Sequence, residues 1–415
     1  MKVSIEAESP PVSSSAACEL RMHVGDQREL LFPAHVAHGD GMLAEIGELV
    51  SRWGVGVGDA LVVTDRMLAG TTVLDPVIAG LQQAGWRTTV YADIGGEPTV
   101  ADARAAAEAA RRSDADVIIG VGGGSVLDIA KVAAFLVANT GDLADYFGGA
   151  GNPRAARPLV LVPTTTGTGA EATRVAVFSD DRGKRVVSHD SLVPLGVVLD
   201  ATAVVGLPPA VTAATGLDAL AHAVESTLST SSTPLTASMG IRAAELLHHW
   251  LPVAHDDPGD LRARRGTLYG AFLAGVALNA GVVLGHSMAY TVANRVHLAH
   301  GVTCAMALPY CVAYNSGAAG TDFAAFTRLF TGDGRSDVLA GAESLASLAD
   351  RFDIPKTPVA AGIPDGEADA MSEECRALYP RPTNPVPMTG EGLQELYRAW
   401  FAGDLHGAAD AGSRA

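Results

Sequence analysis

The sequence predicts two parts of different fold class: an amino-terminal α/β domain with a mainly parallel sheet, followed by an all-α carboxyl-terminal domain. Two observations support this prediction. Up to about residue 207, short apolar runs alternate with helical patterns, which is the order of βαβ units. After the GLPP segment at 206–209, the chain is rich in alanine and leucine and has no clear strand pattern. A chain of 415 residues is long enough for two domains.

The elements are predicted in the following order. Residues 1–30, rich in Ser and Pro and then polar, are expected to be a loose tail leading into an edge strand. The α/β domain is assigned to residues 31–207 and the helical domain to residues 208–415. Strand patterns occupy residues 60–67, 87–93, 115–124, 158–166 and 195–203, with helix patterns at 74–85, 99–114 and 125–139.

Two segments of the helical part need separate predictions. The apolar run 269–293 is rich in small residues but contains Asn279 and His286, so we expect a buried helix, a break at Gly285 and then an active-site segment. The final residues 404–415 are expected to be disordered.

Composition excludes several classes of partner. The net charge of −17 argues against nucleic acid and against an anionic membrane surface. The four cysteines are scattered without a CxxC pair, as in a reducing cytosol. We find no signal-peptide pattern and no apolar run of the ~20 residues that a membrane span needs. We therefore expect a cytoplasmic protein, and its low charged fraction of 18% favours a homodimer or larger homo-oligomer.

The run DVIIGVGGGSVLDIAK indicates a phosphate-binding turn. A buried strand ends in Gly122, Gly123 and Gly124, and a helix is expected to begin at Ser125. Glycines let a diphosphate approach the backbone, and a helix amino terminus offers free N–H groups. Ser125 suits a cap or a phosphate donor, and Asp128, expected in the first turn, suits the helix dipole or a hydrogen bond from the nicotinamide or substrate side. A strand–helix turn without a ligand is the alternative.

A second turn, VPTTTGTGAEAT, follows the next predicted strand. Such a run alone is usually just a turn, but beside the glycine turn it predicts one wall of a nucleotide site. Its candidate residues are Thr164, Thr165, Thr168 and Thr173. Asp65 ends the strand pattern ALVVTD, where a carboxylate can bind ribose hydroxyls and repel a 2′-phosphate. Asp65 therefore favours NAD(H) over NADP(H), with a helix cap for RMLAG as the alternative.

Four residues predict one divalent-metal site. Asp218 and His222 are four residues apart in TGLDALAHAVES, so a helix presents both on one face. His286 and His300 lie 14 residues apart, each next to a glycine. One carboxylate and three imidazoles suit Fe(II) or Zn(II), and open coordination positions could polarise an alcohol or carbonyl oxygen. The alternative is a helical surface pair and two unrelated histidines.

Four blocks together resemble the iron-containing (group III) alcohol dehydrogenases of the dehydroquinate synthase-like superfamily: GGGSVLDIAK, PTTTGTGAEAT, GLPPAVTAATGLDALAHAVES and GHSMAY…HLAHG. The likeness runs from about residue 30 to 400. It implies a nucleotide-binding α/β domain, a metal-binding helical domain with a cleft between them, and Fe(II), or Zn(II) in some members, on the four residues above. The resemblance implies dinucleotide contacts from Gly123, Gly124, Ser125, Thr164, Thr165, Thr173 and Lys184. The contact of Lys184 rests on the resemblance alone, since its sequence context is equally typical of a solvated lysine.

Three positions depart from the family pattern. Tyr290 stands where many members carry a histidine near the substrate, and a tyrosine, titrating near ~10, is a poor proton shuttle. We expect Tyr290 to line the substrate pocket and to act mainly through its shape. Glu97 stands where Asn is frequent, near the adenine side. Arg174 follows the threonine turn, and we favour an outward, solvated arginine over one that binds an acidic substrate.

The resemblance implies interconversion of a small primary alcohol and its aldehyde with NAD(H). An acidic aldehyde bearing a carboxylate or phosphonate is one open possibility, for which Arg174 and Arg381 are the candidate selecting residues. Metal-independent reduction of the maleylacetate reductase kind is an alternative, but its ligand positions are incomplete and here all four are present. An inactive relative that acts as a binding protein would lose the ligands or the phosphate turns.

Overall fold

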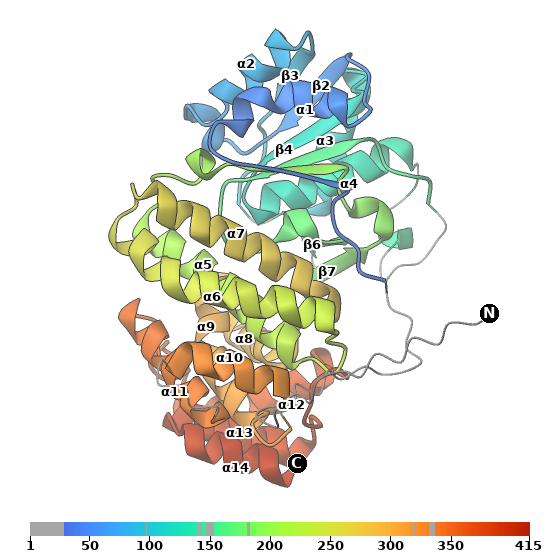
Figure 1. Cartoon of the computed structure of the whole chain (residues 1–415). Helices are drawn as coiled ribbons and strands as arrows, with labels where there is room; N and C mark the ends of the chain where they lie inside the picture. The colour runs from blue at the N-terminus through green and yellow to red at the C-terminus, as the bar shows by residue number, and fades with distance from the viewer. Residues whose placement is uncertain are drawn as a thin grey trace, which may run out of the picture.

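The computed structural model describes residues 29–415 except 97, 140, 142, 147–152, 181–182, 319–320 and 332–336. The predicted tail therefore lies almost entirely outside the described residues, as does Glu97. A six-stranded parallel sheet forms the centre of the amino-terminal half, and helices alone form the other half, as Figure 1 shows from top to bottom. The predicted fold class is confirmed.

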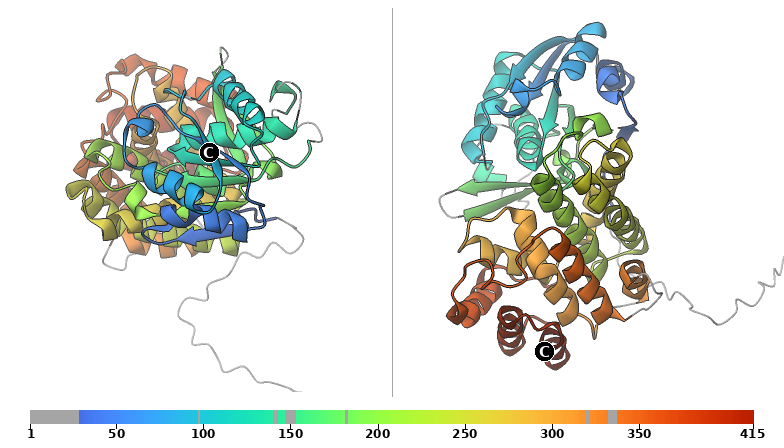
Figure 2. Two further views of the ribbon diagram at one scale, coloured as in Figure 1. Left: turned by 90° about the horizontal axis from the view of Figure 1, so that it is seen from above. Right: turned by 90° about the vertical axis from the view of Figure 1, so that its left-hand side faces the viewer.

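The sheet has the strand order β1-β8-β5-β4-β2-β3. Its strands are β1 (His35–His38), β2 (Asp59–Val63), β3 (Arg87–Tyr91), β4 (Val117–Gly122), β5 (Leu159–Pro163) and β8 (Gly196–Leu199). A separate antiparallel hairpin pairs β6 (Val175–Asp180) with β7 (Gly183–Ser188). The hairpin lies at the level where the two halves meet (Figures 1 and 2).

Helices cover both faces of the sheet. Side chains of α1 (Ile46–Arg52) and α2 (Asp75–Gln83) share one apolar cluster with β2, β4 and β5, while α3 (Val100–Arg112) and α4 (Gly124–Ala138) share another. Every residue of β4 is buried as a result. Burial on both faces explains why the strand patterns are continuous apolar runs and not alternating ones.

The helical half is built around α5 (Pro209–Leu228), which is buried over most of its length and packs against α6, α7 and α9. The other helices are α6 (Pro234–Asp256), α7 (Leu261–Ala277), α8 (Leu284–Ala293), α9 (His300–Tyr314), α10 (Thr321–Thr331), α11 (Val338–Arg351), α12 (Ala368–Leu378), α13 (Gly390–Ala402) and α14 (Leu405–Arg414). No single helix of the described residues is long and apolar enough to cross a membrane, although α7 and α8, joined at a bend of 107°, reach that length and composition together.

Two predictions for this half are wrong in detail. The break before α8 falls at Gly281, which has a φ of +74°, and Gly285 lies inside the helix. Gly285 is needed for another reason, because an added Cβ would lie 2.7 Å from the carboxylate of Glu225. Residues 404–415 are not disordered: α14 forms there, Asp404 accepts a hydrogen bond from the Gly407 N–H, and small residues bring the helix against Tyr314.

Close backbone contacts join the two halves. A Cβ on Gly167, in the threonine turn, would lie 2.8 Å from the Cβ of Thr215 on α5, and Gly169 meets Gly275 on α7 equally closely. The fully buried Arg264 of α7 also donates hydrogen bonds to the Leu207 carbonyl and to Thr212 Oγ1, both at 2.7 Å. The last strand of the sheet ends at Leu199 and α5 begins at Pro209, but the domain boundary itself stays a prediction.

Candidate metal centre and nucleotide edge

The four predicted metal ligands come together from three helices. Asp218 and His222 lie one turn apart on α5, His286 lies in the first turn of α8, and His300 is the first residue of α9. Asp218 Oδ1 is 3.9 Å from His222 Nε2 and 3.8 Å from Nε2 of both His286 and His300. We call these four residues the metal cluster. The alternative of unrelated residues on a surface is wrong, since Asp218 and His286 are buried.

The metal cluster has unsatisfied polar atoms. Asp218 Oδ1, His286 Nε2 and His222 Nδ1 are buried without a hydrogen-bond partner. Such atoms are costly, and where two of them face each other, as Asp218 Oδ1 and His286 Nε2 do at 3.8 Å, they call for an explanation such as an ion. Around a tetrahedral metal with bonds of ~2.1 Å, ligand atoms lie ~3.4 Å apart, close to the separations seen here. The residues present therefore fit a divalent metal.

Burial and charge set the protonation of two cluster residues for this task, whereas at His286 burial works to lower the pKa but Glu225 outweighs it and the pKa is raised. Burial lowers the pKa of His222 to about 4, which leaves a neutral ring with a free lone pair at neutral pH. Burial works to raise the pKa of Asp218, but the three imidazoles outweigh it and the pKa is lowered. A neutral imidazole and an ionised carboxylate are the metal-binding forms of these groups.

Glu225 is a functional residue that sequence reasoning missed. It lies on α5, fully buried, and its Oε1 accepts a 2.6 Å hydrogen bond from His286 Nδ1. Its Oε2 accepts hydrogen bonds from the backbone N–H groups of Val283 and His286. This arrangement keeps the proton on Nδ1 and leaves Nε2 to face Asp218. The available signal was its spacing, three residues after His222 and seven after Asp218, on the same face of a helix.

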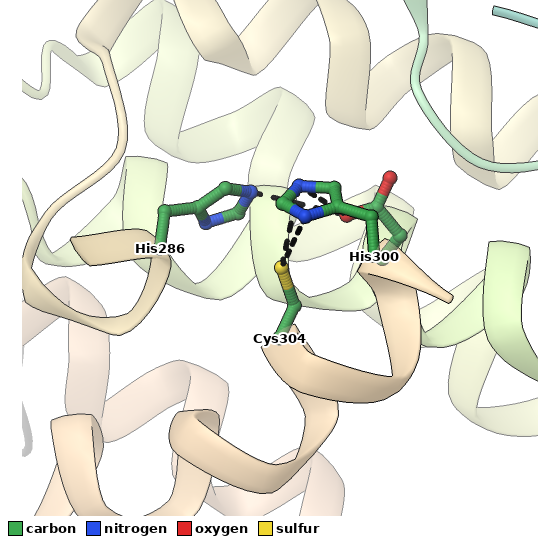
Figure 3. Close-up of side chains that lie close together, drawn as sticks. His286, His300 and Cys304 are labelled. Carbon is green, nitrogen blue, oxygen red and sulfur yellow. Dashed lines mark hydrogen bonds and ion pairs between the residues drawn. The ribbon is translucent and has the colours of Figure 1, made fainter. Parts of the chain in front are cut away.

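Cys304 also belongs to this region and was not predicted. It lies one turn after His300 on α9, with its Sγ 3.5 Å from His300 Nε2, and Figure 3 shows the thiol facing the ring. Potential ligand atoms of Asp218, His286, His300 and Cys304 all lie within 4.8 Å of one another. Burial and the nearby carboxylates hold the pKa of the Cys304 thiol well above its usual range. The geometry thus places a sulfur among the candidate donor atoms, and a metal bound through it would have to displace the thiol proton.

Tyr290 lies beside the metal cluster. Its ring stacks on that of His300, with the ring centroids 5.7 Å apart and an interplanar angle of 12°. The ring of Tyr379 also packs against Tyr290, with a centroid distance of 5.1 Å. Burial raises the pKa of Tyr290 to about 12, so the phenol keeps its proton at neutral pH. Because the ring of Tyr290 packs against the candidate ligand His300, its position supports a role in shaping the substrate pocket.

The glycine and threonine turns meet at the carboxyl ends of β4 and β5. Gly122 pairs with Pro163 in the parallel register, and the Thr164 N–H donates to the Gly122 carbonyl at 3.0 Å. A Cβ on Gly123 would lie 3.2 Å from Thr165, and one on Gly124 would lie 2.6 Å from Thr168. The glycines are therefore needed for packing against the threonine turn, whether or not a ligand is bound. We call this region the nucleotide edge; it comprises Gly122, Gly123, Gly124, Ser125, Thr164, Thr165 and Thr168.

The start of α4 differs from the prediction by one residue. The helix begins at Gly124 with Gly123 at the cap position, so Ser125 is inside the helix and is not its cap. No side chain of the described residues caps this end. The amide N–H groups there are left without a capping side chain, as a diphosphate site requires.

Asp128 and Thr173 have hydrogen-bond partners within the chain, and their predicted cofactor contacts stay predictions. Asp128 lies beyond the first turn of α4, where it accepts a hydrogen bond from the Val177 N–H and lies 3.9 Å from Lys131 Nζ. Fully buried Lys131 donates to Thr173 Oγ1 at 3.0 Å and to the Val175 carbonyl at 2.8 Å. The predicted dipole role of Asp128 is therefore wrong. Both residues help to hold the β6–β7 hairpin against α4.

Asp65 and Lys184 are placed less completely. Asp65 Oδ1 accepts a hydrogen bond from the Leu68 N–H at 2.8 Å, which is the capping geometry named as its alternative role. It follows β2, the neighbour of β4, so it lies along the same sheet edge as the glycine turn. Lys184 lies on β7, but its side chain is outside the described part of the chain.

The two arginine candidates differ. Arg174 is half exposed and pairs with Asp190 at 3.0 Å, which agrees with the outward placement we favoured. Arg381 is partly buried, and its Nε donates a hydrogen bond to Ser287 Oγ at 3.0 Å. Ser287 directly follows the candidate ligand His286 in the sequence. The structure thus brings Arg381, and not Arg174, toward the metal cluster.

A cavity of about 210 Å³ opens elsewhere, beside α9 and α11. Its lining is mainly apolar and includes Met306, Tyr310 and Ile354, but none of the candidate site residues. We assign no ligand to it.

The parallel sheet with its glycine turn and the helices that gather a carboxylate and three imidazoles together define a two-part oxidoreductase architecture. Residues 33–201 match the family model "Iron-containing alcohol dehydrogenase", and residues 212–401 match "Fe-containing alcohol dehydrogenase family, C-terminal". The chain belongs to the iron-containing alcohol dehydrogenase family, an alcohol and aldehyde oxidoreductase family, and the resemblance seen in the sequence is confirmed.

Individual relatives span nearly the whole chain. Long-chain-alcohol dehydrogenase 1 of Geobacillus thermodenitrificans is 35% identical over 388 residues, covering 91% of this chain and 97% of its own. Sulfoacetaldehyde reductase of Bilophila wadsworthia is 33% identical over 322 residues, covering 76% and 82%. The structure of sulfoacetaldehyde reductase from Bifidobacterium kashiwanohense in complex with NAD⁺ is similar with a TM-score of 0.82 at 26% identity, covering 92% of this chain and all of that one.

Proposed function

We propose that this protein is a metal-dependent, NAD(H)-linked oxidoreductase that interconverts a small primary alcohol and its aldehyde, in the cell as an aldehyde reductase. One observation carries the proposal: three imidazole Nε2 atoms lie 3.8–3.9 Å from a single buried carboxylate oxygen that has no hydrogen-bond partner. Asp218, His222, His286 and His300 would hold Fe(II), with Zn(II) as the alternative. When bound, the metal supplies Lewis acidity to the substrate oxygen and NADH supplies the hydride.

The chain's own residues prepare the site for this chemistry. Glu225 fixes the tautomer of His286, and burial keeps His222 neutral. The amino end of α4 would bind the diphosphate of the dinucleotide, with the threonine turn as the opposing wall. Because a Cβ on Gly167 would lie 2.8 Å from the Cβ of Thr215, three residues before Asp218, the threonine turn packs on the helix that carries the first ligand. This contact between the threonine turn and α5 supports a reaction shared by the nucleotide edge and the metal cluster.

The two alternatives have less support. A maleylacetate reductase-like protein that works without metal would not need four converging ligands. An inactive relative would not keep both the metal cluster and an uncapped α4 terminus beside three glycines. A binding assay for metal and for NADH distinguishes these cases, since each alternative fails at one or both.

Metal removal tests the proposal most directly. We expect chelation, or His286→Ala, to lower NADH-dependent reduction of short aldehydes by more than about 1,000-fold and to leave the fold intact, because the α/β half does not use the metal to bury its core. Fe(II) or Zn(II) should restore the chelated sample but not the variant. His249→Ala, which removes an exposed histidine of α6, is the matched control. Full turnover in a demetallated sample contradicts the proposal, and unfolding on chelation indicates a structural site instead.

The cofactor preference rests on Asp65. We expect Asp65→Gly to improve the use of NADPH relative to NADH, because a like charge near the 2′-phosphate is removed. The measurement is kcat/KM for both cofactors. A wild-type preference for NADPH would show that this interpretation of Asp65 is wrong.

The proposed location and oligomeric state of the protein rest on its composition. We propose a cytoplasmic homodimer or larger homo-oligomer without nucleic-acid or membrane partners. A monomer by light scattering at micromolar concentration would contradict the oligomer.

A further inference from the structure

Arg381 is a cation near the metal cluster that the chemistry described above does not use. It follows α12, and its Nε is held by Ser287 Oγ, which in turn donates to the Tyr379 carbonyl at 2.7 Å. Within the described part of the chain, no carboxylate lies within ion-pair distance of Arg381, and its two terminal nitrogens make no hydrogen bond. A guanidinium in this state keeps its planar pair of donors for another group.

The anchor of Arg381 places it on the Tyr290 side of the cluster. Ser287 and Tyr290 are one helical turn apart on α8, so they lie on the same side of that helix. Tyr290 stacks on His300, and Tyr379, whose carbonyl binds Ser287, packs against Tyr290.

The metal cluster is exposed to solvent on the side where Tyr290 and His300 lie. The side chains of Asp218 and His286 are 6% and 4% exposed, whereas that of His300 is 44% exposed. Tyr290 and Arg381 are also only partly buried. A small molecule that reaches the cluster from solvent therefore approaches along His300 and Tyr290, beside Arg381.

We infer that the substrate is a short aldehyde that carries an anionic group, and that Arg381 binds this group through its terminal nitrogens. This inference rests on the proposed function. In a chain with a net charge of −17, an anionic substrate needs a local cation to be accepted. Arg174 does not serve, because Asp190 neutralises it at an exposed position. Carboxylate, sulfonate and phosphonate all match the planar fork of a guanidinium.

The experiment compares anionic aldehydes with neutral aldehydes of equal length, in the metal-loaded enzyme with NADH. The probes are two- to four-carbon aldehydes ending in carboxylate, sulfonate or phosphonate, each paired with its methyl-ended analogue. We expect the wild type to have the higher kcat/KM for an anionic member. Arg381→Gln should lower the anionic-to-neutral ratio of kcat/KM by about 10- to 100-fold, the usual worth of a hydrogen-bonded charge. Millimolar guanidinium should restore part of the ratio in Arg381→Ala.

Arg174→Gln is the control and should leave the ratio unchanged. If no aldehyde of either kind is reduced, the proposed function fails. If the wild type reduces neutral aldehydes as well as anionic ones, or if Arg381→Gln lowers both equally, the inference about Arg381 is wrong and the proposed function stands. Should Arg381→Gln not fold, the wild-type ratio and Arg381→Lys, which keeps the charge, still decide the matter.

Discussion

Each half of the protein contains a buried cluster with ionisable carboxylates, and the two clusters balance the negative charge differently. In the α/β half, the carboxylates of Asp128 and Glu171 are buried near Lys131, so the chain supplies its own cation. In the helical half, Asp218 is equally buried, but no lysine or arginine of the described residues lies within ion-pair distance, and imidazoles face it instead. The α/β cluster is therefore balanced by the chain itself, whereas the cluster around Asp218 needs a ligand, because a buried anion without a cation from the chain is a place for a metal.

The first prediction tests whether Lys131 is the cation that balances the buried carboxylates of the α/β half. Burial lowers the pKa of Lys131 to about 8, so the lysine is still mainly charged at pH 7. We expect Lys131→Met to lower the free energy of unfolding by about 3–5 kcal/mol at pH 7, since it leaves Asp128 and Glu171 buried without a positive charge. The pKa of Asp128 is already raised to about 6 and that of Glu171 to about 7, mainly by burial. A carboxyl group whose pKa is higher in the folded protein destabilises it as the pH rises from the unfolded value to the folded one. The loss should therefore be smaller at pH 5 than at pH 7.

Chemical denaturation at the two pH values measures this effect. Lys356→Met, which removes an exposed lysine paired with Asp350, is the control and should cost less than about 1 kcal/mol. Adding Asp128→Asn to Lys131→Met should recover part of the loss. An equal loss at both pH values would mean that Lys131 acts through packing alone.

The second prediction concerns the support of the metal cluster. We expect Glu225→Gln to weaken metal binding by about 10- to 100-fold, because the carboxylate that orients His286 loses its charge. Competition with a chelator measures the affinity. Glu245→Gln, at an exposed glutamate of α6, is the matched control. A drop in thermal stability with unchanged metal affinity would show that Glu225 only supports the fold.

The third prediction concerns which metal is bound. A sulfur donor favours Zn(II) over harder ions, and Cys304 Sγ lies among the ligand atoms. We expect Cys304→Ser to lower the ratio of bound zinc to bound iron several-fold when both are offered together. Metal analysis gives the ratio, and a sulfur-to-cobalt absorption band in the Co(II)-loaded wild type should vanish in the variant. An unchanged ratio and spectrum would show that the thiol only packs beside His300.

The sequence predicts the elements of this fold better than the partners of its polar residues. Strands and helices of the α/β half fall where the apolar runs lie, because burial on both faces of the sheet makes these patterns strong. The metal cluster was also predictable, since the i, i+4 pair on α5 depends on local geometry. Cys304 and Lys131 were missed, because their roles depend on which helix or strand packs opposite, and spacing within one segment carries no such information. Glu225 carried a spacing signal on α5, but its partner His286 lies on another helix. The disorder predicted for residues 404–415 failed for the same reason: α14 is stabilised by contacts of small residues with α9 and α13.

The smallest effect is expected at Tyr290, which borders the metal cluster without belonging to it. The hydroxyl keeps its proton at neutral pH, since burial raises its pKa to about 12, so it is a poor proton shuttle. We expect Tyr290→Phe to keep most of the turnover rate, within about tenfold, to leave metal content intact and to shift the preference among substrates. The variant keeps the ring that stacks on His300 and loses only a polar atom, so shape is nearly conserved. A loss of a hundredfold or more on the best substrate, with metal still bound, falls in the range of general acid–base catalysis and would assign proton transfer to Tyr290.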